Sequence, residues 1–215
     1  MESTSLTQQI LAALDILRSV GVEGRNYAKN EYDTQRYETL IQTVSRLYAL
    51  LSREHEEPAK IQGLLERELG SVTPKIGIDV GVIHNDRMLV LRRSDDQTWC
   101  LPCGWMTVGE TVVQTAIREV FEETRIRIAP IGYLRIVTKG PVDYPILIHH
   151  QLNVLVVSKS VDIPPAVKLS EEHSQYQWIS SPDEVHWHSG HEKAAQALYT
   201  FMKSPSSIPM LSLDQ

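Results

Sequence analysis

Apolar residues recur at helical spacing over the first seventy positions of the chain and predict three amphipathic helices. The first should begin after Ser5, because Ser5 and Gln8 have the spacing of a capping box. Its apolar positions are Leu6, Ile10, Leu14 and Leu17. We expect this helix to end at Gly21 and Gly24, since glycine commonly follows the last turn of a helix.

Two further helices are predicted in the same region. One has Asp33 or Thr34 as its N-cap and runs to Leu51. The other begins with Pro58 in its first turn and ends at Gly70. Helices of this size bury little apolar surface alone. We therefore expect residues 1–72 to form a small helical domain that packs on the next domain or on a second copy of the chain, as in a homodimer.

From residue 73 onward the chain has strand character. Apolar runs of strand length occur at 75–83, 88–91, 126–139, 145–157 and 176–179. The turn Asn85-Asp86 separates the first two runs, Pro130 breaks the third, and the fourth is apolar on both faces, as in a central strand. A closing helix is predicted over 192–202. We assign this second domain to residues 73–204 and a tail to 205–215.

One predicted helix inside this domain combines an apolar side with a cluster of acids. Thr111 and Gln114 have the spacing of a capping box, and Gly104 and Gly109 permit a turn before it. At about 100° per residue, its apolar residues gather on one side and its glutamates on the other. The apolar set is Val113, Ala116, Ile117, Val120 and Phe121, and the acidic set is Glu119, Glu122 and Glu123.

The three carboxylates suggest that a cation lies between them. At spacings of three and four residues they repel one another, which costs a few tenths of a kcal/mol per pair on a bare helix without a counter-charge. Oxygen ligands of this kind suit Mg²⁺ or Mn²⁺. A solvated acidic face is the alternative, because most runs of charge are only that.

The residues around this helix form the pattern G-x5-E-x7-R-E-U-x-E-E, in which U is apolar. It starts at Gly104 and includes Glu110 and Arg118. The pattern resembles the signature of the Nudix, or MutT-like, hydrolases, over about residues 74–203. The resemblance implies an α+β fold, an α/β/α sandwich with a mixed sheet, preceded here by the small helical domain. The chain departs from the family at Cys103 and Arg125, where glycines are expected; a left-handed cap at Arg125 costs about 1 kcal/mol or more.

The resemblance also implies a metal site on this helix. Glu119, Glu122 and Glu123 are expected to bind one or more Mg²⁺ ions, with Mn²⁺ as the other candidate. The carbonyl of Cys103 and the backbone of Gly104 are expected to lie close enough to contribute. The metal would neutralise a diphosphate and lower the pKa of a bound water that attacks phosphorus.

Other residues are expected to support this chemistry. Arg118, one turn before Glu122, should orient the carboxylates through an ion pair. Glu110 is either a ligand through water or a structural partner of the turn. A glutamate from the late loop at 169–175, Glu171 or Glu172, is the candidate base or extra ligand, with plain solvation as the alternative.

Five residues are candidates for binding the substrate, and one of them is Gly104 in the turn before the signature helix. Arg92 and Arg93 follow a strand and either hold a phosphate or face water. Tyr27 and Tyr32 lie in a segment that resembles the N-terminal domain of a bacterial Nudix subgroup, which includes CDP-choline and ADP-ribose pyrophosphatases. One of these tyrosines is expected to stack on a base, unless both are packing residues at a domain boundary.

Both cysteines fall in one C-x-x-C motif, Cys100 and Cys103. A redox motif requires the second cysteine to open a helix, whereas the signature helix starts about eight residues later. A structural zinc site requires two more ligands, for which His186, His188 and His191 are the supply. The simplest interpretation is two reduced cysteines that fill a turn.

Charge and length limit the remaining possibilities. A net charge of −6 and a pI near 5.7 disfavour binding to duplex nucleic acid, and no stretch approaches 18 apolar residues. We expect a cytoplasmic enzyme without a membrane segment. The expected reaction is Mg²⁺-dependent hydrolysis of a nucleoside diphosphate linked to a group X, with ADP-ribose or CDP-choline favoured. A nucleoside triphosphate or RNA 5′-end pyrophosphohydrolase and a non-catalytic nucleotide-sensing module are the alternatives.

Overall fold

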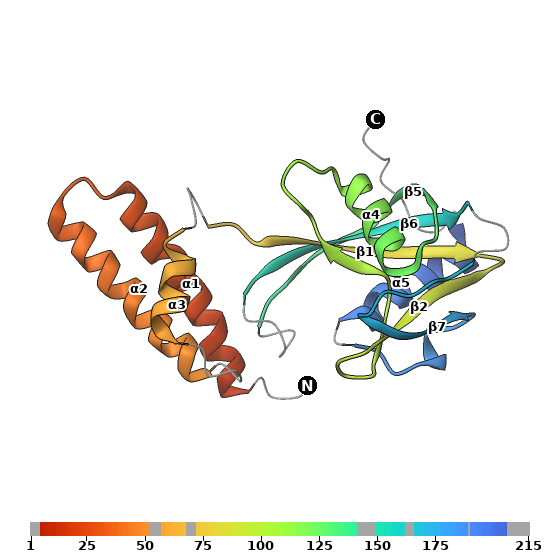
Figure 1. The fold of residues 1–215 in the computed structure, drawn as a ribbon, viewed down its shortest axis with the longest axis horizontal. Helices are drawn as coiled ribbons and strands as arrows, with labels where there is room; N and C mark the ends of the chain where they lie inside the picture. Colours follow the sequence, from red (N-terminus) through yellow and green to blue (C-terminus); the bar gives the residue numbers. More distant parts are fainter. Residues whose placement is uncertain are drawn as a thin grey trace. The chain divides into compact units, whose positions relative to one another are not determined.

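The computed structural model describes residues 5–51, 57–67, 72–141, 149–161, 166–188 and 190–205. The chain divides into two compact units (Figure 1). One consists of residues 1–74 with 139–151, and the other of residues 75–138 with 152–215. Among the described residues, no helix has the length and apolar character that a membrane span requires.

The first unit contains the helices α1 (Leu6–Tyr27), α2 (Glu31–Leu51) and α3 (Pro58–Leu65). The capping box of Ser5 and Gln8 is present, as predicted. The predicted end of the first helix is wrong, because α1 continues through Gly21 and Gly24 to Tyr27. A Cβ atom at Gly24 would overlap the ring of Tyr37 on α2. These glycines therefore allow two helices to pack closely and do not terminate one.

The other two helices differ from expectation at their ends. α2 begins earlier than predicted, since the side chain of Asn30, and not Asp33 or Thr34, accepts a hydrogen bond from the backbone N–H of Asp33 at 2.9 Å. Pro58 opens α3, as predicted. The predicted end of this helix at Gly70 lies outside the described residues.

Seven strands in the described residues form one mixed sheet. They are β1 (Lys75–His84), β2 (Arg87–Arg93), β3 (Trp99–Cys100), β4 (Cys103–Trp105), β5 (Ile128–Lys139), β6 (Gln151–Ser160) and β7 (His173–Ile179). The main order is β3-β2-β1-β6-β5, with β4 paired to β1 and β7 paired to β2. The arrows of β1 and β6 run in the same direction in Figure 1, whereas β1 and β2 are antiparallel.

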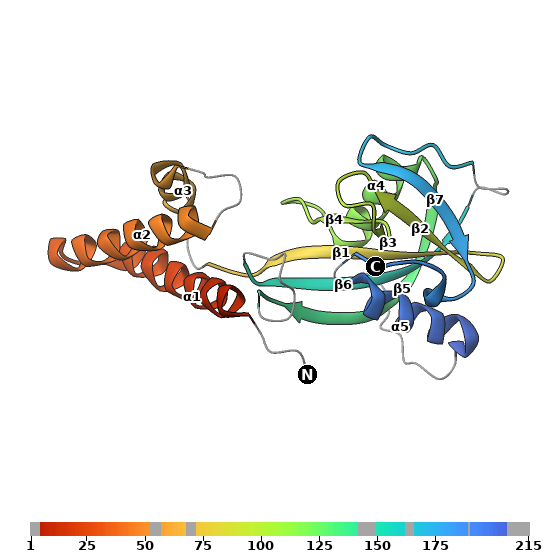
Figure 2. The ribbon, with the colours of Figure 1, turned by 90° about the horizontal axis from the view of Figure 1, so that it is seen from below.

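Helices cover both faces of this sheet, as the expected α/β/α sandwich requires. Figure 2 shows α4 (Val112–Thr124) and α5 (His191–Lys203) on opposite sides of it. Alternate residues of β6 supply the two cores: Val154 and Val156 pack with the α4 side, and Leu155 and Val157 pack with the α5 side. The prediction of a central strand, buried on both faces, is confirmed for the described part of this segment.

Several strand predictions need correction. Pro130 lies inside β5 and does not break it, because β5 is an edge strand where a missing N–H is tolerated. The last strand begins at His173 and not at Tyr176. The short strands β3 and β4 were not predicted, and residues 145–148 lie outside the described part of the chain. The turn at Asn85-Asp86 is confirmed, with positive φ at both residues.

Candidate active site

Arg118 is the centre of an ion-pair network on α4. Its guanidinium donates to Glu110 at 2.7 and 2.9 Å, to Glu119 at 2.8 Å and to Glu122 at 3.2 Å. It also donates to the carbonyl of Trp105 at 3.0 Å. One cation thus holds three carboxylates and the turn before the helix in a single arrangement.

Glu110 belongs to that turn. It accepts hydrogen bonds from the backbone N–H of Thr107 at 3.2 Å and from the hydroxyl of Thr115 at 2.9 Å, in addition to Arg118. The hydrogen bond from Arg118 is the largest influence that lowers the pKa of Glu110, to about 2. Of the two expected roles for Glu110, this geometry matches that of a structural partner of the turn.

Gly104 and Glu119 approach each other without space for a side chain between them. A Cβ atom at Gly104 would overlap the carboxylate of Glu119. Burial raises the pKa of Glu119, and the nearby charges of Glu122 and Glu172 add to this effect, although Arg118 opposes it. The carboxylate therefore lies in a crowded anionic site against the backbone of β4.

Glu123 is the most buried of the three clustered carboxylates, with 4% of the residue exposed. Its side chain accepts a hydrogen bond from the backbone N–H of Cys103 at 3.2 Å. Burial, followed by the charges of neighbouring acids, raises its pKa well above the ordinary value. The helical pattern predicts all three glutamates on the polar side of α4, and for Glu123 this prediction is wrong.

The same correction applies to the apolar side of this helix. Ala116 and Val120 are fully buried, whereas Ile117 and Phe121 are 41% and 42% exposed. The buried face is thus rotated toward Glu123 relative to the predicted one. At the end of the helix, Arg125 has the left-handed conformation with φ of 61°, and its guanidinium lies over the ring of Phe121. A non-glycine residue therefore occupies the cap that the family pattern gives to glycine.

The late loop brings two more residues to the cluster. Glu123, Glu172 and His173 each offer a ligand atom within 4.8 Å of the others. His173 is buried, with Nε2 3.8 Å from Glu123, and its Nδ1 has no hydrogen-bond partner among the described residues. Burial lowers its pKa to about 4. Sequence reasoning selected Glu172 but missed His173, for which the only signal was its position next to Glu172.

The donor set at this cluster fits a divalent cation. Four carboxylates, Glu119, Glu122, Glu123 and Glu172, act on one another electrostatically, and burial raises the pKa of two of them. A buried Glu123 carboxylate requires a positive charge nearby. Neither the neutral imidazole of His173 nor the backbone amide of Cys103 carries one. Oxygen donors that repel one another in this way are the ligands that Mg²⁺ and Mn²⁺ bind.

Arg92 and Arg93 are engaged with their own hairpin. Arg92 donates to the carbonyl of Gln97 at 3.1 Å and to the side chain of Gln175 at 3.3 Å. Arg93 donates to Asp95, and its Cα pairs with that of His173 across β2 and β7. Arg93 is therefore next to a residue of the cluster, and phosphate binding by either arginine stays a prediction.

Tyr27 and Tyr32 belong to the helical unit. Tyr27 is the last residue of α1 and Tyr32 lies in the first turn of α2, with 67% and 76% exposed. Neither is a packing residue within its own unit. Their contact with a base stays a prediction.

The two cysteines are free thiols on either side of a tight connection between β3 and β4. Cys103 opens a strand and not a helix, which argues against the redox motif. The carbonyl of Cys103 precedes Gly104, and its N–H holds Glu123, so its backbone is part of the cluster.

Comparison with known proteins agrees with this geometry. The model of the NUDIX domain matches residues 74–201, which is more than half of the chain. Over 160 residues the chain is 23% identical to "Putative ADP-ribose pyrophosphatase YjhB" of Bacillus subtilis (strain 168), covering 74% of this chain and 76% of that protein.

Solved structures show the same fold. A crystal structure of a UDP-X diphosphatase has a TM-score of 0.53 at 16% identity, covering 93% of this chain and 96% of that one. A NUDIX hydrolase from Nitrosomonas europaea has a TM-score of 0.54 at 18% identity, covering 66% and 95%. Because the family match spans more than half of its length, this chain belongs to the NUDIX family of hydrolases.

Proposed function

We propose that this hydrolase cleaves the diphosphate of a nucleoside diphosphate linked to a group X, giving a nucleoside monophosphate and X-phosphate, and that Mg²⁺ is its metal. The observation that carries the proposal is the set of carboxylates that Arg118 and the Cys103–Gly104 backbone hold together at α4. Glu119, Glu122 and Glu123 would hold the ion. Bound there, it supplies Lewis acidity toward a diphosphate and toward water.

The protein's own residues fix the geometry of this reaction. Arg118 spans Glu119 and Glu122, so these two carboxylates keep one orientation when a charged substrate enters. The N–H of Cys103 fixes Glu123 from the opposite side. Arg118 is thus a positioning residue, because its guanidinium donors are committed to protein acceptors.

Glu172 is our candidate to accept a proton from the attacking water. It is exposed and lies in the turn before β7, near Glu123 and His173. Its carbonyl accepts a hydrogen bond from the backbone N–H of Ser94 at 2.9 Å, which fixes the loop beside β2. An exposed carboxylate at the edge of the cluster can exchange its proton with solvent between turnovers.

ADP-ribose and CDP-choline are the favoured substrates. The name of the Bacillus subtilis relative supports ADP-ribose, and the resemblance of the segment around Tyr27 and Tyr32 supports both. The similarity to the UDP-X diphosphatase covers 93% of this chain, which adds sugar nucleotides of uridine to the compounds to be tested.

The test is a product analysis with purified protein and Mg²⁺, repeated with Mn²⁺. The panel contains ADP-ribose, CDP-choline, UDP-glucose, nucleoside triphosphates and 5′-triphosphorylated RNA. Release of AMP or CMP together with X-phosphate is the expected result. Turnover of only the triphosphates or RNA would instead establish the alternative pyrophosphohydrolase, and no turnover with either metal would favour a nucleotide-sensing module.

A pair of isosteric variants ties the activity to the site. Glu122→Gln should lower turnover by orders of magnitude, about 10²-fold or more, because one charged donor is lost without a change of shape. Glu31→Gln is the matched control, since Glu31 lies in the first turn of α2 in the helical unit. Equal activity of both variants would remove Glu122 from the site.

A further inference from the structure

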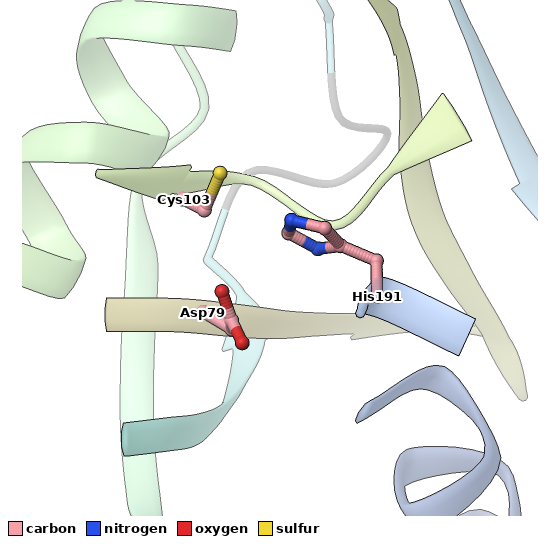
Figure 3. A group of neighbouring side chains, drawn as sticks. All are labelled: Asp79, Cys103 and His191. Carbon is pink, nitrogen blue, oxygen red and sulfur yellow. The ribbon is translucent and has the colours of Figure 1, made fainter. Parts of the chain in front are cut away.

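Three side chains from separate elements lie close together, as Figure 3 shows. They are Asp79 of β1, Cys103 of β4 and His191 of α5. We propose that they form a second metal site, for a thiophilic divalent cation such as Zn²⁺, distinct from the carboxylates of α4. This inference does not rest on the proposed substrate.

The distances between the ligand atoms suit one ion. One oxygen of Asp79, the sulfur of Cys103 and one ring nitrogen of His191 all lie within 4.8 Å of one another. Zinc binds such atoms at about 2.0–2.3 Å, so two ligands of one ion lie no more than about 4.6 Å apart. Side-chain movements of a fraction of an ångström to about 1 Å therefore bring these atoms into coordination distance.

Backbone pairing and hydrogen bonds hold the three residues in place. Asp79 and Cys103 are directly paired between β1 and β4, and Asn153 donates to both oxygens of Asp79 at 3.3 Å. Asp79 alternates with Ile78 and Val80, which pack on the α4 side, so its side chain faces α5. This arrangement resembles the outer contacts that orient metal ligands in proteins.

His191 offers a ring nitrogen as the third ligand atom. The backbone N–H of Leu101 donates to its Nδ1 at 3.3 Å, so Nδ1 carries a lone pair and no proton. A cation that takes the Nδ1 lone pair displaces the buried N–H of Leu101 from its acceptor, so the metal–ligand bonds must outweigh the loss of this hydrogen bond. His191 is 6% exposed and Asp79 is 3% exposed, which limits competition from water.

The chemistry of the three donors selects the kind of ion. A thiolate, an imidazole and a carboxylate together suit Zn²⁺ and disfavour Mg²⁺ and Ca²⁺, which bind oxygen. Binding replaces the proton of the Cys103 thiol by the metal and releases that proton to solvent. Three protein ligands leave a fourth position for water.

This site differs from the zinc site considered from the sequence, which used both cysteines and the histidine tract. The sulfur of Cys100 lies 3.6 Å from the carbonyl of Leu91 and 3.7 Å from Nε2 of His173. His188 is 2.7 Å from a carboxylate oxygen of Asp96. Of these cysteines and histidines, Cys103 and His191 belong to the cluster. Asp79, which the sequence pattern did not indicate, completes it.

Cys103 connects the two sites. Its sulfur belongs to the second cluster, while its backbone N–H holds Glu123 and its carbonyl precedes Gly104. A cation at the second site would link β1, β4 and the start of α5, next to the turn that precedes α4. We therefore expect Zn²⁺ to raise the melting temperature of the full-length protein, as a ligand of the native state does.

The experiment is a titration of the reduced, metal-free protein with Co²⁺, followed by absorption spectroscopy. The expected result is a near-ultraviolet charge-transfer band of a Co²⁺–thiolate bond that saturates at one equivalent and is abolished by Zn²⁺. Cys103→Ser and His191→Asn should each remove or weaken the band. Asparagine retains an acceptor for the N–H of Leu101, which protects the fold in the second variant.

Matched variants separate this site from its neighbours and from the catalytic cluster. Cys100→Ser and His188→Asn should keep the band, because neither residue belongs to the cluster. Glu122→Gln should also keep it, even though that variant loses turnover. No band in the wild-type protein, or a band that depends on Cys100 and not on Cys103, would overturn the proposal; circular dichroism of each variant confirms that it is folded.

Discussion

Gly104 lies against the carboxylate of Glu119 so closely that no side chain fits between them. Gly104→Ala should therefore displace Glu119 from its place beside Arg118. A displacement of about 1 Å in an active site costs about 10²-fold in rate, and we expect a loss of this size. Turnover of the variant and of the wild-type protein, at saturating metal, measures it.

The control for this substitution is Gly63→Ala. A Cβ atom at Gly63 meets no atom within 4 Å, so the exchange adds a methyl group without a clash. Its turnover should equal that of the wild-type protein. If Gly104→Ala retained full turnover, the close approach to Glu119 would have no role in the reaction.

Glu123→Gln should raise the stability of the metal-free protein. In the absence of metal, the variant removes a buried negative charge and should be more stable than the wild-type protein by about 1–3 kcal/mol. Glutamine can still accept the hydrogen bond from the N–H of Cys103, which preserves local geometry. Thermal unfolding with and without Mg²⁺ measures the effect, and the metal should stabilise the wild-type protein more. A destabilised metal-free variant would show that the Glu123 charge is compensated within the protein.

The start of the signature helix was predictable because its cause is local. Thr111 and Gln114 are three residues apart, and the capping box they form is present. The same holds for the turn at Asn85-Asp86. In each case a few neighbouring residues determine the backbone, so their order in the sequence is sufficient.

The residues that sequence reasoning missed depend on contacts between distant segments. His173 reaches Glu123 because β7 pairs with β2, and Asp79 meets His191 because α5 packs behind β1. Neither contact leaves a periodic signal. Gly24 was misread for the same reason, since its partner Tyr37 lies on another helix. An acid in an otherwise apolar strand, as at Asp79, is the one clue that was available.

Stability of the helical unit should depend on Asp15 and on pH. Burial raises the pKa of Asp15, but hydrogen bonds from His150 and Arg18 outweigh it, so the net pKa is lowered from 3.8. A lowered pKa stabilises the fold above the ordinary value, and this stabilisation is lost as pH falls through the lowered value. Asp15→Asn should therefore destabilise the protein by about 1.5–3 kcal/mol at neutral pH. The difference in the free energy of unfolding between the wild-type protein and Asp15→Asn should shrink well below pH 3.8. Urea unfolding, followed by the helical circular dichroism signal at several pH values, measures this difference. A difference that stays constant with pH would contradict the prediction.

A homodimer is predicted for the protein in solution. Large apolar side chains of the helical unit are exposed, among them Leu6 at 72%, Ile16 at 60% and Leu50 at 80%. Apolar surface of this kind gains free energy when a second copy covers it. Light scattering at micromolar concentration should give twice the chain mass of 24.4 kDa. The mass of a single chain would refute the prediction.

Gly24→Ala tests whether packing or helix propensity dominates in α1. Alanine favours a helix interior over glycine by about 1 kcal/mol, so propensity alone predicts a more stable protein. Packing predicts the opposite, because the new methyl group would overlap the ring of Tyr37 and overpacking costs about 1–3 kcal/mol. We expect the clash to win and the melting temperature of the helical unit to fall. Gly63→Ala in α3, which meets no neighbour, should instead raise it. If both substitutions stabilised the protein, α1 and α2 would have to separate at this contact without cost, and the close packing at Gly24 would not explain why glycine occupies this position inside α1.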